Sequence, residues 1–545
     1  MNYQVLTPGP PSTQATSHMI RMRDGALLAA DVYLGNEQAP SVLIRLPYDK
    51  NGSYCFIEQI AQFFLSAGYQ VVAQDVRGKF RSQGETQLFV NEALDGYDTI
   101  AWISEQPWSD GSVVMWGESY FGFTQWAAAS TAHPALKAIS PRLTGTSLIE
   151  PQRDTPEILE RPVENSETYV YPITHFNKNE TFLWEPSWST RPYVSEFDAI
   201  QKELGFRSDS FDQRYPGPSF LRRFPHGHPF DAPSIPCLLT IGWWDNIAPE
   251  SWRDWRTLNA GFPQWQPNLY LNIDAIDHEN FRFGSTNSSE DRSDDEIADL
   301  LPAMLQPTID FFDIFVKNQG DVGAFPRVRW NLAGTDSWQE SESWPPSGTT
   351  SQELHLQARG TLGTEADPFE SELEWQHDPD DPVPSSVPNP FAYLIAMPDE
   401  STRADRNDVL TFRSTVFNRG IDLVGSVSVK LTVESTARSM DVFAWLLDVS
   451  PDGSARRIAR GNLHLNSIDG PRSVVIDMFE VGYRLDVEHS LQLQIASSDF
   501  PEFLLHPGHE GDPLAATKVN TNTQRLTVGG PSGSVLSFST LEISE

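Results

Sequence analysis

Short apolar segments alternate with segments of helical periodicity between residues 41 and 140, and this alternation limits the folds open to the chain. The apolar segments have the length and character of buried strands and cover residues 41–46, 69–74, 112–116 and 136–140. The segments between and after them repeat apolar residues at helical spacing, over residues 56–67, 92–105 and 120–131. Such alternation predicts a parallel sheet with helices on both faces.

The alternation is interrupted once and later gives way to a different pattern. Residues 145–236 are rich in Pro, Trp and Tyr and lack the alternation, which predicts a helical cap inserted into the α/β domain. Beyond residue 350, short alternating runs separated by turns indicate an all-β sandwich. We therefore expect four segments: an α/β domain in two parts, residues 1–144 and 237–350, a cap at 145–236, and a β domain at 351–545.

Composition excludes several classes of partner. The chain has 545 residues, too many for one core, and its 39 Lys and Arg against 74 Asp and Glu give a formal charge of −35. Such a surface repels phosphate backbones and anionic lipids, so we expect neither nucleic acid nor a membrane as partner. No basic, apolar leader and no long apolar run occur in the sequence, so a cytoplasmic location is expected. Two cysteines, Cys55 and Cys237, leave a disulfide open and offer no metal-binding spacing.

The strongest chemical motif is Gly117-Glu118-Ser119-Tyr120-Phe121-Gly122, which follows the strand predicted at 112–116 and precedes a helix. A nucleophile elbow needs this context, because a sharp strand-to-helix turn exposes the serine hydroxyl above the sheet. The second glycine stands three residues after Ser119 rather than two, so the general G-x-S-x-G pattern is not met. The alternative interpretation is an ordinary serine that caps the helix.

A serine nucleophile needs a base that is held by a third group, and in α/β-hydrolases the order along the chain is Ser, then Asp or Glu, then His. Asp245 follows the apolar run 236–244, and His278 follows the run 268–274. Both positions lie where a parallel strand would end, at the same sheet edge as Ser119. The other histidines fall in the N-terminal segment, directly after the elbow, in the predicted cap or in the predicted β domain.

Further motifs occur in the same order along the chain. They include Arg23-Asp24-Gly25, Pro47-Tyr48, Gln74-Asp75-Val76-Arg77-Gly78-Lys79-Phe80, Gly117 to Gly122, Gly242-Trp243-Trp244-Asp245, Asp378-Pro379, Arg406-Asn407-Asp408 and Ser497-Ser498-Asp499-Phe500-Pro501. Over nearly its whole length the chain resembles the family of cocaine esterase, X-Pro dipeptidyl peptidase and α-amino acid ester hydrolases, the CocE/NonD hydrolases.

The resemblance implies an α/β-hydrolase fold with an inserted helical cap and a C-terminal all-β jelly-roll domain. It implies Ser119, Asp245 and His278 as a catalytic triad, with an oxyanion hole formed by the Tyr48 hydroxyl and the Tyr120 backbone N–H. It implies no metal and no cofactor. One departure concerns the residues before His278, which are Asp-Ala-Ile-Asp where relatives usually carry Gly-Pro-Trp-Ser. Asp277 would therefore place a charge beside the imidazole.

We therefore predict a serine esterase that acts on a small-molecule ester through an acyl-enzyme. Aromatic residues of the cap would line the acyl pocket or form the cap's own core: Tyr169, Phe182, Trp184 and Trp188. Alternatives within the family are an X-Pro dipeptidyl peptidase and an α-amino acid ester or amide hydrolase, which would take short peptides or amino-acid derivatives. An alternative of another class is a catalytically silent protein that binds through its β-sandwich. The sequence does not decide between a monomer and a homo-oligomer.

Overall fold

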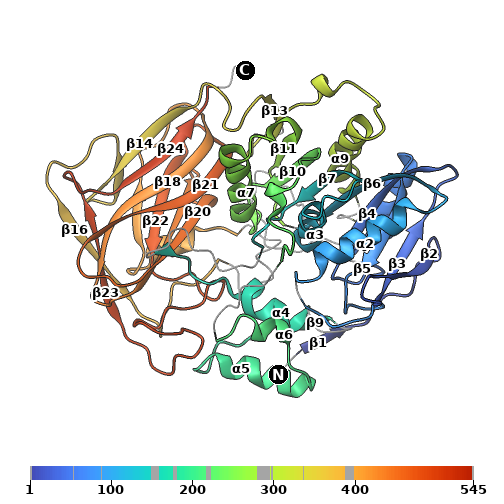
Figure 1. The fold of residues 1–545 in the computed structure, drawn as a ribbon. Helices are drawn as coiled ribbons and strands as arrows, with labels where there is room; N and C mark the ends of the chain where they lie inside the picture. The colour runs from blue at the N-terminus through green and yellow to red at the C-terminus, as the bar shows by residue number, and fades with distance from the viewer. Residues whose placement is uncertain are drawn as a thin grey trace.

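The computed structural model describes residues 3–52, 55–87, 89–148, 159–175, 181–216, 223–278, 295, 299–335, 337–386 and 398–542. Figure 1 shows three parts: a β domain in yellow to red on one side, an α/β domain in blue to green on the other, and cap elements at the lower edge. The predicted fold class is confirmed, as an α/β-hydrolase sheet with helices is followed by a largely antiparallel β domain. The domain limits given above stay predictions.

The α/β domain is built on a ten-stranded sheet. In spatial order its strands are β13 (Trp338–Ser341), β12 (Val328–Asn331), β11 (Leu269–Asp274), β10 (Cys237–Gly242), β7 (Leu136–Arg142), β6 (Ser109–Glu118), β4 (Ala39–Leu46), β5 (Gln70–Asp75), β3 (Leu27–Tyr33) and β2 (Thr16–Arg21). Strands β12 to β5 are parallel, and the outer strands are antiparallel. The carboxyl ends of the parallel strands therefore meet at one edge, where open α/β sheets bind ligands.

Helices cover both faces of this sheet, as the alternation predicts. Helices α1 (Ile57–Ser66) and α9 (Leu301–Phe315) share one apolar cluster with the sheet, whereas α2 (Glu92–Ser104), α3 (Ser119–Ala129) and α7 (Ala248–Gly261) contribute to another. Helix α1 buries a single stripe at helical spacing, formed by Ile57, Ile60, Ala61 and Phe64. Gly68, with φ +81°, ends that helix at the predicted position.

The cap lies between β7 and β10. Its described elements are β8 (Leu159–Glu160), the π-helix η2 (Ser166–Val170), α4 (Tyr171–Thr174), β9 (Thr181–Trp184), α5 (Val194–Leu204), α6 (Asp209–Asp212) and the 3-10 helix η3 (Pro229–Asp231). Strand β9 pairs with β1 (Tyr3–Leu6) of the N-terminal segment, and β8 pairs with a strand of the β domain. Figure 1 shows β1 beside β9 at the lower edge. Backbone pairing thus connects the cap to segments far away in the sequence.

The β domain forms one hydrogen-bonded network of strands. They are β14 (Thr350–Gln357), β15 (Thr361–Gly363), β16 (Ser371–His377), β17 (Leu410–Arg413), β18 (Ile421–Ser435), β19 (Met440–Val449), β20 (Ala455–Leu465), β21 (Arg472–Leu485), β22 (Ser490–Ala496), β23 (Asn522–Val528) and β24 (Val535–Thr540). The 3-10 helix η7 (Ser401–Asp405) also belongs to this part, whereas the 3-10 helices η4 (Gln266–Asn268) and η5 (Val322–Ala324) precede β11 and β12 of the α/β domain. Alternate residues of β23, and of the middle of β18 from Gly425 to Leu431, are buried, which gives the period-two pattern of a sandwich.

Direct contacts join the β domain to the α/β domain near Asp245, the predicted carboxylate of the triad. The Trp244 indole N–H donates to the backbone carbonyl of Arg457 at 2.9 Å. On α7, Arg256 pairs with Glu480 at 2.6 Å. Because Trp244 directly precedes Asp245, the β domain helps to fix the loop that carries this carboxylate.

Candidate active site

Ser119 lies at the turn between β6 and α3, where its backbone adopts φ +53°. A non-glycine residue in this region stores roughly 1–3 kcal/mol of strain, and nucleophile elbows require such a turn. A Cβ on Gly117 would collide with the Phe121 side chain. A Cβ on Gly122 would lie 2.6 Å from Thr144 Cγ2 and 3.0 Å from the Arg142 carbonyl oxygen. The glycine three residues after the serine is therefore required where the first turn of α3 crosses the segment after β7.

Buried hydrogen bonds hold this turn in place. The Ser119 N–H donates to the Leu143 carbonyl at 3.2 Å. From α3, the Gln125 amide donates to the Gly117 carbonyl at 3.0 Å and accepts from the Ser140 N–H at 2.9 Å. Gln125 is fully buried, so these bonds are shielded from water. They connect the ends of β6 and β7 directly beneath the serine.

Asp245 and His278 meet at the same sheet edge. His278 Nδ1 lies 2.7 Å from Asp245 Oδ1, and the Asp245 side chain is fully buried. Pairing between β10 and β11 continues past the strand ends, as the Trp244 N–H donates to the Ile276 carbonyl at 3.1 Å. This continuation brings the two loops together. A carboxylate that accepts at Nδ1 fixes the tautomer in which Nε2 is the basic nitrogen.

The loop that contains Tyr48 follows β4 at this edge. The Tyr48 ring packs edge-on against Phe121 and His175, with centroids 6.2 and 6.4 Å away. Lys50, two residues later, is buried, and its ammonium donates to Asp75 at 2.8 Å. These contacts restrict the position of the loop on both sides of the tyrosine.

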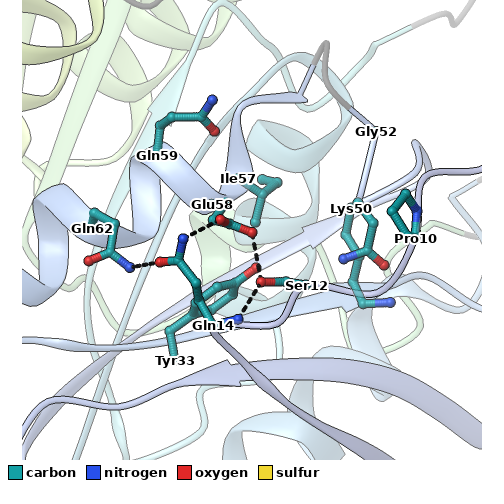
Figure 2. Close-up of a pocket in the computed structure, with 11 residues that line it drawn as sticks. Pro10, Ser12, Gln14, Tyr33, Lys50, Gly52, Ile57, Glu58, Gln59 and Gln62 are labelled. Atoms are coloured by element: carbon teal, nitrogen blue, oxygen red, sulfur yellow. Dashed lines mark hydrogen bonds between the residues drawn. The ribbon is translucent and has the colours of Figure 1, made fainter.

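The N-terminal segment contacts the same loop, as the Gly9 N–H donates to Asp49 at 2.5 Å, and it lines one side of an open pocket of about 370 Å³ beside Lys50. Figure 2 shows Glu58 of α1 accepting from Ser12 and Gln14, with Gln62 donating to Gln14. The polar groups at this end of the pocket therefore bind one another and fasten the N-terminal segment to α1.

Hydrogen bonds of its phenol hold Tyr120 in place. The phenol donates to Glu92 at 3.0 Å and accepts from the Phe89 N–H at 2.8 Å, in the core. Burial, with the nearby Glu92, raises the Tyr120 pKa far above its ordinary value, so the phenol stays neutral. The Tyr120 N–H lies in the first turn of α3, where backbone N–H groups lack intrahelical acceptors. The oxyanion roles of Tyr48 and Tyr120 stay predictions.

The cap aromatics form a cluster with residues of the β domain. Tyr169 and Trp184 are buried and pack against Phe197, with ring centroids 6.1 and 5.4 Å away. Trp188 packs on Phe500 at 5.7 Å. The side chain of Phe182 lies outside the described residues. This packing favours the interpretation of these aromatics as the cap's own core, and their role in substrate binding stays a prediction.

Two buried residues near Tyr48, Lys79 and His175, had no role at the site predicted from the sequence. Lys79 is fully buried, and its ammonium donates to the His175 carbonyl of the cap at 2.5 Å. Burial lowers the pKa of Lys79 to about 7 and that of His175 to about 3. His175 stacks on Tyr171 at 3.9 Å. Lys79 lies within the family motif Gln74 to Phe80, which was the one signal that pointed to it, whereas nothing in the cap sequence distinguishes His175.

The sequence matches two family models in chain order. Residues 24–272 match the X-Pro dipeptidyl-peptidase (S15 family) model, and residues 321–536 match that of the X-Pro dipeptidyl-peptidase C-terminal non-catalytic domain. A cocaine esterase from Rhodococcus sp. (strain MB1 Bresler) is 28% identical over 546 residues, covering 90% of this chain and 91% of that protein. The chain belongs to the CocE/NonD family of serine hydrolases. The family predicted from the motifs is thus confirmed.

Solved structures share the fold of this CocE/NonD hydrolase over nearly its whole length. An aminopeptidase from a Thaumarchaeota archaeon has a TM-score of 0.81 at 20% identity and covers 97% of this chain and 96% of its own. An α-amino acid ester hydrolase has a TM-score of 0.79 at 21% identity and covers 96% of both chains. At 20–21% sequence identity, this similarity shows a shared fold and does not extend to activity.

The described residues lack a metal-binding group of side chains, a disulfide and a membrane-spanning helix. In the described parts of this CocE/NonD hydrolase, no group of three or more metal-ligating side chains gathers. Cys55 and Cys237 are not joined by a disulfide. Among the helices of the described residues, none is long and apolar enough to cross a bilayer. The cytoplasmic location stays a prediction.

Proposed function

We propose that this serine hydrolase cleaves carboxylic esters through an acyl-enzyme on Ser119. The observation that carries the proposal is the 2.7 Å contact between His278 Nδ1 and buried Asp245, at the sheet edge that presents the strained Ser119 turn. Nucleophile, orienting carboxylate and base thus follow the ends of β6, β10 and β11 in that order along the chain. This is the chain order and the edge expected of an α/β-hydrolase.

In the first step, His278 Nε2 takes the Ser119 proton as Oγ attacks the ester carbonyl carbon. The Tyr48 hydroxyl and the Tyr120 N–H donate to the oxyanion of the tetrahedral intermediate. The intermediate collapses as His278 returns the proton to the departing alkoxide. Water then attacks the acyl-enzyme with the same histidine as base, which releases the acid and restores Ser119. Buried Asp245 stabilises the imidazolium that forms twice in this cycle.

An ester is proposed as substrate because the cocaine esterase match covers about nine-tenths of both chains. The peptidase alternative is favoured by the S15 description of the family model that matches residues 24–272. Peptide bonds are harder to cleave because an amine leaves less readily than an alcohol and must be protonated as it departs. The two activities are therefore distinguished by rates on matched ester and anilide substrates.

The test compares wild type, Ser119→Ala and Ser66→Ala, a helical serine that is exposed on α1. Each is assayed on p-nitrophenyl esters of increasing acyl length and on an X-Pro-p-nitroanilide. We expect ester turnover in wild type and Ser66→Ala and none in Ser119→Ala. A fluorophosphonate should label wild type at Ser119, identified by mass spectrometry of the peptide. Dominant anilide cleavage would make the protein a peptidase, and turnover that survives Ser119→Ala would remove Ser119 as nucleophile.

A further inference from the structure

A buried carboxylate on α7 binds one residue with both of its oxygens. Asp254 is 5% exposed and lies among apolar side chains that include Trp255 and Leu258. Its Oδ2 accepts from the Thr146 N–H at 2.6 Å, and its Oδ1 accepts from the Thr146 hydroxyl at 2.7 Å. Hydrogen bonds to an ionised acceptor are about twice as strong as neutral ones, so this is a firm attachment.

Thr146 belongs to the segment that supports the nucleophile. In that segment, which follows β7, the Leu143 carbonyl accepts from the Ser119 N–H at 3.2 Å. Thr144 packs so closely on Gly122 that no Cβ fits between them. A displacement of this segment therefore reaches the backbone of Ser119 through direct contact.

The N-terminal end of helix α7 holds the carboxylate of Asp245. The Ile247 N–H donates to Asp245 Oδ1 at 3.1 Å, and the Ala248 N–H donates to the Asp245 carbonyl at 3.1 Å. One turn later, the Ser251 hydroxyl donates to the Thr144 carbonyl at 2.5 Å. The helix thus spans the distance between the Asp245 loop and the segment behind Ser119, and Asp254 attaches its second turn to that segment.

We propose that Asp254 is a positioning residue that, as a carboxylate, holds the Ser119 turn in register with the Asp245–His278 pair. Asp254 acts through Thr146 and does not touch substrate. The inference rests on the proposed function, because it takes Ser119 as nucleophile and Asp245 with His278 as its partners. A displacement of about 1 Å at a reacting centre can lower the rate by roughly a hundredfold.

The protonation state of Asp254 changes near neutral pH. Burial raises its pKa to about 7 against the two hydrogen bonds from Thr146, which lower it; Glu250 adds to the rise, and Arg253 opposes it. On β10 the Cys237 thiol is affected in turn, as burial and the Asp254 charge raise its pKa. Protonation makes one carboxylate oxygen a donor, which removes an acceptor from Thr146. The attachment therefore weakens as pH falls through about 7.

Stability and activity respond oppositely to this group. The folded-state pKa lies above the ordinary value of about 3.9, so the folded protein binds the additional proton between these two values. Stability contributed by the neutral form is present below about pH 4 and is lost as pH rises to 7. An amide at position 254 avoids this loss at pH 8 while it keeps one acceptor and one donor for Thr146. A lower rate in a variant of equal or greater stability would not follow from a merely structural role.

The experiment compares wild type, Asp254→Asn and, as a matched acid-to-amide control, exposed Asp310→Asn on α9. Labelling of Ser119 by a fluorophosphonate and kcat and KM for a p-nitrophenyl ester are measured from pH 5.5 to 9, with thermal unfolding at pH 8. For Asp254→Asn we expect kcat and the labelling rate to fall about tenfold or more at pH 8. KM should change less than twofold, and the unfolding temperature should not fall. The acid limb of log kcat should become shallower, because Asp254 no longer titrates there.

A second variant keeps the inference testable if Asp254→Asn does not fold. Thr146→Val retains the side-chain shape and the N–H donor but removes the hydroxyl bond. The Asp254 carboxylate then loses a donor that stabilises its ionised form, so its pKa rises. We therefore expect kcat to fall and the acid limb of the kcat profile to move to higher pH. If wild type is labelled at Ser119 and both variants match its rates at every pH, the positioning role is overturned and the proposed function stands. If wild type is not labelled at Ser119, the proposed function fails and the positioning role fails with it.

Discussion

His278 Nδ1 lies 2.7 Å from Asp245 Oδ1, and the Asp245 side chain is excluded from solvent while His278 keeps 11% of its side-chain surface. Loops from two neighbouring strands form this contact, and the continued β10–β11 pairing sets their separation. A buried carboxylate cannot turn towards water, so the imidazole it binds has one defined orientation.

Replacing Asp245 with Asn should lower kcat by about four orders of magnitude with little change in KM. The amide cannot hold the tautomer that leaves Nε2 basic, while the shape of the site is retained. Steady-state kinetics on the best p-nitrophenyl ester would measure the effect. Circular dichroism would verify that the variant is folded. A kcat within tenfold of wild type would contradict the role of Asp245.

Tyr48→Phe should lower kcat by roughly 10²- to 10³-fold through loss of one oxyanion donor. The ring contacts with Phe121 and His175 do not need the hydroxyl, so thermal stability should stay close to wild type. Tyr97→Phe, whose ring packs on His133, serves as a control and should keep full activity. If both variants were equally active, the oxyanion hole would have to be formed by other donors.

Gly122→Ala should lower both stability and activity, because the new methyl group would lie 2.6 Å from Thr144 Cγ2 and 3.0 Å from the Arg142 carbonyl oxygen. We expect roughly 1–3 kcal/mol of destabilisation, as for other overpacked sites. Gly261→Ala is the matched control, since no atom lies within 4 Å of its added Cβ at the end of α7. Urea unfolding and ester turnover would test both, and a neutral Gly122→Ala would show that α3 does not need this close approach.

The β domain should lose stability as pH falls from about 6.5 to 4. His506 is 3% exposed, and burial lowers its pKa to about 4, against about 6.5 for an unfolded histidine. Below 6.5 the unfolded chain therefore binds the proton more readily, and the stability conferred by the neutral imidazole is lost progressively down to pH 4. For this one group the loss amounts to about 3 kcal/mol at most.

Urea unfolding of wild type at pH 7 and pH 5 would measure the loss, with His506→Gln and exposed His226→Gln as comparison variants. His506→Gln should reduce the difference between the two pH values, because this group no longer titrates. His226→Gln should leave it unchanged. An identical pH dependence in all three proteins would contradict the prediction.

The sequence by itself determined the elements and the chain order of the site. Strands β4 and β5 and helix α1 follow from local periodicity, which reflects which side of each element is buried. Ser119 was identifiable because an elbow is a local turn with local residue requirements. Asp245 and His278 were predicted as its partners because each follows a strand of a parallel sheet, whose carboxyl ends share one edge. The structure brings these two side chains into contact, and their catalytic roles stay predictions.

The tertiary structure alone decided how these parts are held together. Gly122 is needed because Thr144 from another strand end packs against it, and no pattern within the motif shows that. Asp254 and Thr146 are 108 residues apart, and the sequence does not reveal that a carboxylate in an amphipathic helix lies inside the core. The cap aromatics likewise acquired their partners from the β domain. Periodicity records only the burial of a side chain, whereas its neighbours depend on how distant elements pack.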